Sequence, residues 1–160
     1  MKPKGFTLIE LVMVLVLIGI ISAFVAPRLG SITSTSAAVF AAKLRSDLRY
    51  AQALAMTQTM RYRVYINTAP SPNPGYAVVN DANGNGIWGE AGEVAINPAG
   101  GGTLSVALNA GQYAGITVST PAGGYIEFDS LGGPTGGGAV LTVSPGGSVI
   151  TITETTGAVN

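Results

Sequence analysis

The sequence predicts an α+β protein in which a long, bent N-terminal helix packs on an antiparallel β domain. An apolar segment opens the chain, an amphipathic helical pattern follows it, and short strands separated by Gly- and Pro-rich turns fill the rest. At 160 residues, the chain has room for one domain and an anchor. We expect four segments: a short basic leader (1–5), an apolar helix (6–27), its amphipathic continuation (28–60) and a β domain (61–160).

The apolar segment covers residues 6–26 and carries a single charge, at Glu10. As a helix it would extend about 31 Å, close to the roughly 30 Å of a bilayer's hydrocarbon core. Lys2 and Lys4 precede it, so the positive-inside rule predicts a cytoplasmic N-terminus and a β domain on the other side of the membrane. The alternative is a secretory signal peptide cut after Ala23, although Ile21 suits such a site poorly.

Glu10 distinguishes these interpretations. A carboxylate in the middle of a bilayer costs about 2.5–3.5 kcal/mol and usually marks function. The residues three and four positions away carry no cation, so the partner must come from elsewhere. A cut between Gly5 and Phe6 would create an α-ammonium one helical turn from Glu10, and a neighbouring subunit would carry the same group.

The start of the chain resembles the class III signal of type IV pilins and type II secretion pseudopilins, in the run Lys4-Gly5-Phe6-Thr7-Leu8-Ile9-Glu10. The resemblance implies that a prepilin peptidase cuts after Gly5 and methylates the amine of Phe6. It also implies that Glu10 contacts the N-terminus of an adjacent subunit during assembly. The expected fold is therefore pilin-like.

Between residues 35 and 60 the apolar positions recur with a helical period. Pro27 is expected to end or kink the preceding helix, and Gly30 to weaken it. Lys43 and Asp47 can pair at a spacing of four residues. We expect the charged residues here to form a solvated face, while the apolar stripe packs on a sheet; that stripe contains Phe40, Leu44, Leu48, Ala51 and Ala55.

After Met60 the pattern becomes that of strands, with turns about every ten residues. A tight hairpin is predicted at Pro145-Gly146-Gly147. The predicted strands are 61–67, 75–79, 93–96, 103–108, 115–119, 125–128, 139–143 and 148–153. This order resembles that of the H-type minor pseudopilins and T-type fimbrial minor pilins. The features that carry this resemblance are residues 44–55, the 81–93 loop, residues 125–128 with Gly132, and a strand ending near 156–157.

One loop has the start of a calcium-binding pattern. Asp81, Asn83 and Asn85 place oxygen ligands on alternate positions before a glycine. Glu90 and Glu93 lie on either side of the position where the full twelve-residue pattern requires a bidentate Glu. A looser calcium site built from these five residues is one hypothesis, and an Asn/Gly-rich turn without metal is the favoured one.

Composition argues against catalysis. The chain has no His and no Cys, which removes His-based triads, His-ligated zinc and thiol chemistry. Glu127 and Asp129 could form an acid/base pair on one strand face, but a solvated face is the favoured interpretation. Trp88 is expected to anchor its loop on the domain rather than to contact a partner.

The charges also constrain the partners. All eight Lys and Arg residues lie at or before Arg63, so we expect no nucleic-acid binding by the β domain. The resemblance implies a structural subunit of a type II secretion pseudopilus or a type IV pilus, not an enzyme, that resides in the bacterial inner membrane before it enters a filament. Implied partners are other pilins, the prepilin peptidase and the inner-membrane assembly platform. A pilus-displayed adhesin or DNA-uptake pilin is the alternative.

Overall fold

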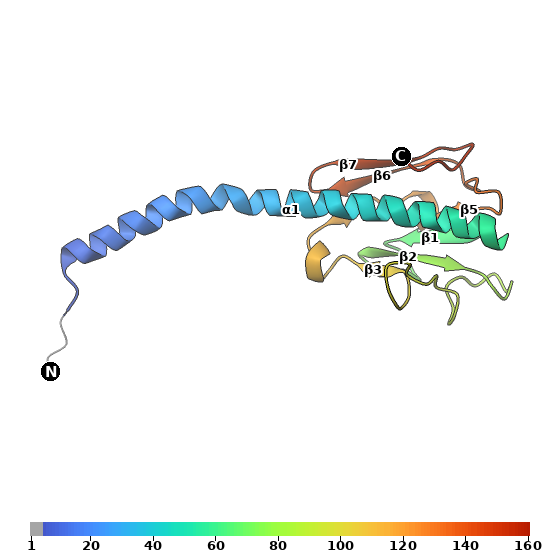
Figure 1. The fold of residues 1–160 in the computed structure, drawn as a ribbon, viewed down its shortest axis with the longest axis horizontal. Helices are drawn as coiled ribbons and strands as arrows, with labels where there is room; N and C mark the ends of the chain where they lie inside the picture. The colour runs from blue at the N-terminus through green and yellow to red at the C-terminus, as the bar shows by residue number, and fades with distance from the viewer. Residues whose placement is uncertain (1–4) are drawn as a thin grey trace. The chain divides into compact units, whose positions relative to one another are not determined.

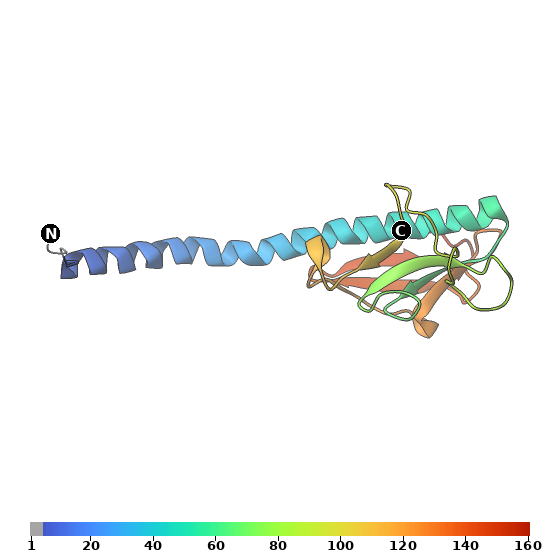
Figure 2. The ribbon, with the colours of Figure 1, turned by 90° about the horizontal axis from the view of Figure 1, so that it is seen from below.

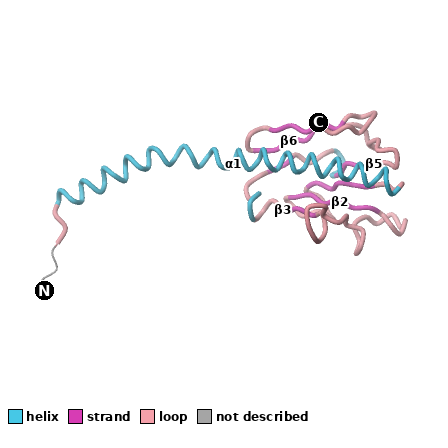
Figure 3. The backbone as a smooth tube through the Cα atoms, viewed as in Figure 1, coloured by secondary structure: helices cyan, strands magenta, loops and turns pink. Residues whose placement is uncertain are grey.

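The structure is a computed structural model that describes residues 5–160, without the side chains of residues 24–34. Within that range the chain forms one long helix, α1 (Leu8–Gln58), followed by seven strands. Figure 3 distinguishes the helix from the strands and loops. Their bounds are β1 (Tyr62–Ile66), β2 (Gly75–Asn80), β3 (Ser105–Ala107), β4 (Thr117–Val118), β5 (Tyr125–Phe128), β6 (Ala139–Ser144) and β7 (Ser148–Ile152), with 3-10 turns at Gly111–Tyr113 and Ala122–Gly124.

The chain divides into two compact units, residues up to Thr33 and residues 34–160, and α1 contributes to both. Helix α1 continues through Pro27 and Gly30, so of the two effects predicted for Pro27, an end or a kink, the helix does not end there. A proline removes one backbone donor, which a helix of 51 residues can lose without ending. The predicted kink concerns residues whose side chains lie outside the described part.

The C-terminal end of α1 falls two residues before the predicted position. Thr59 has φ 53°, and the Met60 N–H donates to the Ala55 carbonyl at 3.2 Å. This is the bond pattern of a Schellman motif, which places a left-handed residue directly after the helix. Glycine usually occupies that position, because a β-branched side chain is strained there.

The strands form two antiparallel sheets, of order β3-β2-β1-β5 and β4-β6-β7. Figure 1 shows α1 crossing the seam between them. The predicted hairpin at residues 145–147 is confirmed, with Val143 paired to Ser148. The predicted strand at 93–96 instead makes isolated bridges, from Val94 to Val79 and from Ile96 to Thr103, because a neighbouring turn interrupts each ladder.

The main core lies between residues 37–55 of α1 and the inner faces of both sheets, as Figure 2 shows from the side. The predicted helical stripe is confirmed, since all five of its apolar residues are fully buried. Opposite them lie strand residues such as Val64, Val78 and Phe128 from the larger sheet, and Leu141 and Ile150 from the smaller one. Alternation along each strand sends these side chains inward.

The outer face of the larger sheet carries a second apolar cluster. Tyr65, Ala77 and Val79 are buried there beneath Trp88 and neighbouring side chains. The loop between β2 and β3 therefore covers the sheet face that α1 does not cover. The expectation that Trp88 anchors its loop on the domain is confirmed.

Candidate functional site

The predicted cleavage point lies at an exposed position before the helix. Gly5 and Phe6 are both outside α1, and the Phe6 side chain is 81% exposed. A methyl group added at Gly5 would meet no other atom within 4 Å. Lys2 and Lys4, which complete the predicted signal, lie outside the described residues. The peptide bond between Gly5 and Phe6 is therefore free of packing that would block a peptidase.

Glu10 lies in the first turn of α1, where its carboxylate has a local role. Its Oε2 accepts hydrogen bonds from the Thr7 backbone N–H at 3.2 Å and from the Thr7 hydroxyl at 3.1 Å. The Glu10 N–H donates in return to Thr7 Oγ1 at 3.3 Å. This reciprocal pair is a capping box, which satisfies backbone donors that the start of a helix leaves free.

The sequence analysis did not identify the role of Thr7. The signal was present, because a Thr followed three residues later by Glu before an apolar run marks a helix start. The cap explains how Glu10 has partners inside one chain although no described cation pairs with it. Both oxygen-bearing side chains are exposed, so a second subunit can reach them.

The first half of α1 exposes its apolar side chains on all sides. The large apolar side chains from Leu8 to Ile21 have exposed fractions between 44% and 81%. In the part of the chain that the structure describes, no helix is both long and apolar enough to cross a membrane. Residues 24–27, which belong to the predicted span, lie outside that part. Exposed apolar surface of this extent marks a surface that another partner covers.

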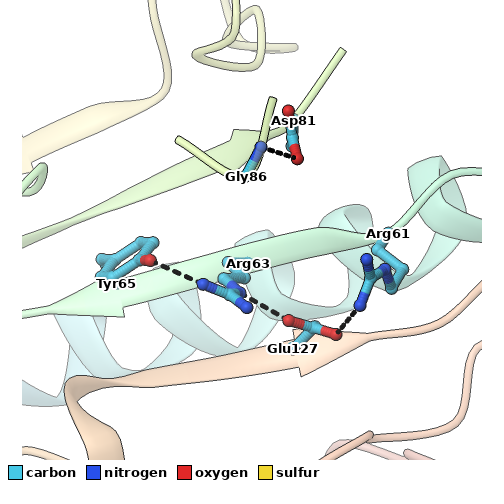
Figure 4. A network of polar contacts seen from close by, with 6 residues as sticks. All are labelled: Arg61, Arg63, Tyr65, Asp81, Gly86 and Glu127. Carbon is cyan, nitrogen blue, oxygen red and sulfur yellow. Dashed lines mark hydrogen bonds and ion pairs between the residues drawn. The ribbon is translucent and has the colours of Figure 1, made fainter. Parts of the chain in front are cut away.

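The loop containing residues 81–93 uses its oxygen atoms to hold its own backbone. Asp81 accepts the N–H groups of Asn85 and Gly86, each at 3.0 Å, and Asn83 Oδ1 accepts the Asn85 N–H at 2.9 Å. Figure 4 shows the contact between Asp81 and Gly86. These bonds form an Asx-stabilised turn of the kind that the metal-free interpretation describes.

The two glutamates of this loop have different environments. Glu93 is 4% exposed and accepts the N–H groups of Ala82, Asn83 and Glu90. Glu90 is half-buried, and hydrogen bonds from the Asn83 and Asn85 side chains lower its pKa. Among the described residues no group of three or more His, Cys, Asp or Glu side chains is placed to hold a metal ion. Calcium binding stays a prediction.

Glu127 is not on a solvated strand face, contrary to our expectation. It is 5% exposed, and it pairs with Arg63 Nε at 2.5 Å and Arg61 Nη1 at 3.3 Å. Figure 4 shows the two arginines converging on it from β1 and the residue before β1. Asp129 lies beyond the end of β5, where it accepts the N–H groups of Leu131 and Gly133. Glu127 and Asp129 therefore have separate partners and do not form an acid/base pair.

Arg63 also stacks between two aromatic rings. Its guanidinium carbon lies 3.9 Å from the centroid of Trp88 and 4.2 Å from that of Tyr125. It donates to the Tyr65 hydroxyl at 3.0 Å, as Figure 4 shows. Burial lowers the pKa of Arg63, but the bonds to Tyr65 and Glu127 outweigh this and raise it. The cation therefore fastens the Trp88 loop to the sheet.

The charged face predicted for α1 is solvated at Arg49 but not at Asp47. Asp47 is 5% exposed, and its Oδ2 accepts from Lys43 at 2.9 Å and from the Tyr76 hydroxyl. The predicted pairing of Lys43 with Asp47 is thus confirmed, but in a buried site. Burial, together with the adjacent Asp47 charge, raises the pKa of Tyr76 far above its usual value.

Two family models match the chain. The prokaryotic N-terminal methylation motif matches residues 1–26, and the family model of type II transport protein GspH matches residues 41–157. No curated protein matches the chain in sequence. Two crystal structures of the Pseudomonas aeruginosa type IV minor pilin FimU, in space groups P21 and P65, are similar in fold. Their sequence identities to this chain are 16% and 15%, and the TM-score is 0.47 for both. Each match covers 75% of this chain, and the two matches cover 83% and 87% of the FimU chains.

The match to the GspH model spans well over half of the 160 residues, and the methylation motif precedes it along the chain. The chain therefore belongs to the GspH family, and it is a pilin-like structural subunit that is anchored in a membrane and assembles with other pilins into a filament.

Proposed function

We propose that the chain is a minor pseudopilin or minor pilin that a prepilin peptidase cuts between Gly5 and Phe6 and methylates at the new amine. Residues 6–27 hold it in the inner membrane in a single pass, with the N-terminus cytoplasmic and the β domain periplasmic. It then passes to a filament through the inner-membrane assembly platform. It performs no catalysis itself.

The observation that carries this proposal is the surroundings of Glu10. Its carboxylate is the one charge on the described part of an otherwise apolar, exposed helical segment. Among the described residues it has only the polar groups of Thr7 as partners. Such a group is costly in a bilayer unless a cation approaches it. The mature amine of Phe6 on a neighbouring subunit supplies that cation.

Mass spectrometry of the protein taken from membranes and filaments tests the processing step. We expect a chain that starts at Phe6 and carries one added methyl group. Gly5→Leu should block cleavage without altering the fold, because the space around Gly5 is empty. A chain that keeps residues 1–5 in filaments, or one that starts at Phe24, would overturn the proposal.

The assembly step is tested with Glu10→Leu and Glu10→Gln. Both remove the charge, and Gln keeps an oxygen that can accept the bonds from Thr7. We expect both variants to be processed and to remain in the membrane, but to enter filaments at least about tenfold less than wild type. Glu10→Asp is the control that keeps the charge. Normal entry of the Leu variant into filaments would show that the carboxylate has no assembly role.

A further inference from the structure

Two arginines on α1 have no acidic partner. Arg49 donates from Nε and Nη2 to the Val159 carbonyl at 3.0 and 2.7 Å, and Arg45 donates from Nη2 to the Val149 carbonyl at 3.2 Å. The Arg45 Nε is buried without a hydrogen-bond partner among the described residues. Carbonyl oxygens accept these bonds but do not neutralise the charges.

The other cations of residues 34–160 differ in this respect. Lys43 is paired with Asp47, and Arg61 and Arg63 share Glu127. Arg45 and Arg49 lie four residues apart, so they are neighbours on the helix surface, where like charges repel. Each guanidinium has five N–H donors, of which only one or two are used here. Arg49 is exposed and Arg45 is half-buried.

We infer that Arg45 and Arg49 together bind a carboxylate of a neighbouring subunit in the filament. A guanidinium binds a carboxylate through two parallel N–H bonds, and two guanidiniums four residues apart on a helix face the same side. A second copy of this chain carries the complementary group: Glu154 makes no ion pair within the described residues, and neither do Asp81 and Glu90, which accept hydrogen bonds in their own loop. The inference rests on the proposed function, because it needs a neighbouring subunit.

Anionic lipid headgroups are a less suitable partner. Arg45 lies 18 residues beyond the end of the proposed membrane segment at Pro27. At 1.5 Å per residue this is about 27 Å along the helix, whereas the headgroup region adds only about 5–8 Å to each side of the hydrocarbon core. The length of helix between the two arginines and the proposed membrane segment therefore favours a protein carboxylate over a lipid phosphate as their partner.

Carbodiimide coupling in assembled filaments gives a direct test. Arg49→Lys keeps the charge and introduces an amine that a carbodiimide joins to any carboxylate in contact with it. Lys43 and Asp47, at 2.9 Å, provide an internal control, because they should couple within every chain. We expect a crosslink from position 49 to an Asp or Glu of another pilin subunit. If the Lys43–Asp47 link forms and position 49 stays unlinked, the inference is wrong.

A second variant separates charge from fold. Arg49→Gln keeps an N–H donor for the Val159 carbonyl but removes the charge. We expect its entry into filaments to fall about tenfold, with an unchanged unfolding midpoint in detergent. Arg61→Gln is the matched control, since that arginine is 60% exposed and shares its acid with Arg63. Equal entry of the two variants would contradict the inference, as would binding to anionic vesicles that only Arg49→Gln abolishes.

Failure of this inference can be distinguished from failure of the proposed function. A wild-type chain that is not cut at Gly5, or that is absent from filaments, refutes the proposed function itself. A wild-type chain that is cut and assembled, while both arginine variants behave like it, refutes only the role of Arg45 and Arg49.

Discussion

Helix α1 carries two carboxylates whose surroundings are opposite. Glu10 receives hydrogen bonds only from Thr7, three residues away, and the apolar side chains beside it are exposed. Asp47 is buried between Lys43 and Tyr76, and the apolar side chains beside it are in the core. The N-terminal half of the helix, with Glu10, requires a partner to cover it. The C-terminal half, with Asp47, is covered by its own chain.

The comparison explains why one helix serves two purposes. From residue 37 onward, the β domain buries the apolar stripe, and Lys43 and Asp47 neutralise each other on the helix. Before residue 24, the described large apolar side chains are exposed, so what stabilises them must be lipid or other subunits. Mutations in the second half should therefore change the stability of the isolated chain, whereas those in the first half should change assembly.

The largest effect on stability is expected at Glu127. Glu127→Ala leaves Arg63 stacked between two rings without a counter-charge, which should cost about 3–5 kcal/mol in the free energy of unfolding. Chemical unfolding of the full chain in detergent micelles measures this. Glu127→Gln should cost less, because its amide oxygen still accepts a hydrogen bond. An unfolding free energy equal to that of wild type would mean that the buried ion pairs add nothing.

A smaller effect is expected where Asp47 meets Tyr76. Tyr76→Phe removes a hydrogen bond to a charged group, which should cost about 1.5–3 kcal/mol. Glu10→Leu, on the same helix, should change the same unfolding free energy by less than about 0.5 kcal/mol. If the two substitutions had equal effects, the contrast between the two halves of α1 would not hold.

The same tyrosine predicts a pH dependence. The folded chain keeps Tyr76 neutral, since its pKa is raised from the usual value of 10.0. Its contribution is therefore fully present below pH 10 and is lost as the pH rises, because only the unfolded chain then releases the proton. Above about pH 10, stability should fall by about 1.4 kcal/mol per pH unit from this group. Tyr76→Phe should flatten that decline, and an unchanged slope would contradict the assignment.

Most of the elements that were predicted correctly could be predicted from local sequence patterns. The period of the apolar stripe identified the buried face of α1, and alternation with turn residues located the strands, with β5 at its predicted bounds. The division into two sheets was not predicted, because it depends on pairings between distant strands. Nothing local in Arg61, Arg63 or Glu127 shows that β1 and β5 are neighbours.

The residues of the candidate site show the same contrast between local and distant signals. Gly5, Phe6 and Glu10 were found because their spacing along the chain is itself the signal. The interpretation of Asp47 and Glu127 as solvated was wrong, because their partners Tyr76 and Arg63 are 29 and 64 positions away. Charged side chains are mostly exposed, so burial of these two could be inferred only from the contacts that the fold creates.

The two ends of α1 offer a more sensitive comparison. Thr59 holds a left-handed conformation that favours glycine, whereas Thr7 has the conformation and side chain that a helix start favours. Thr59→Gly should therefore stabilise the chain by about 1 kcal/mol, as the strain of a side chain at positive φ disappears. Thermal unfolding in micelles would show a higher midpoint. A lower midpoint would mean that the Thr59 side chain makes contacts worth more than the strain.

At the other end of α1, Thr7→Val should have a small effect that is confined to the first turn. It removes the hydroxyl that binds both the Glu10 N–H and its carboxylate, but the backbone N–H of residue 7 still donates to Glu10. We expect a loss of about 0.5–1 kcal/mol, seen as a roughly threefold faster hydrogen exchange of the first-turn amides in micelles. Thr7→Ser keeps the hydroxyl and should exchange like wild type. If Thr7→Val also enters filaments less well, the cap holds Glu10 in the orientation that assembly needs; if entry is unchanged, the cap serves only the helix.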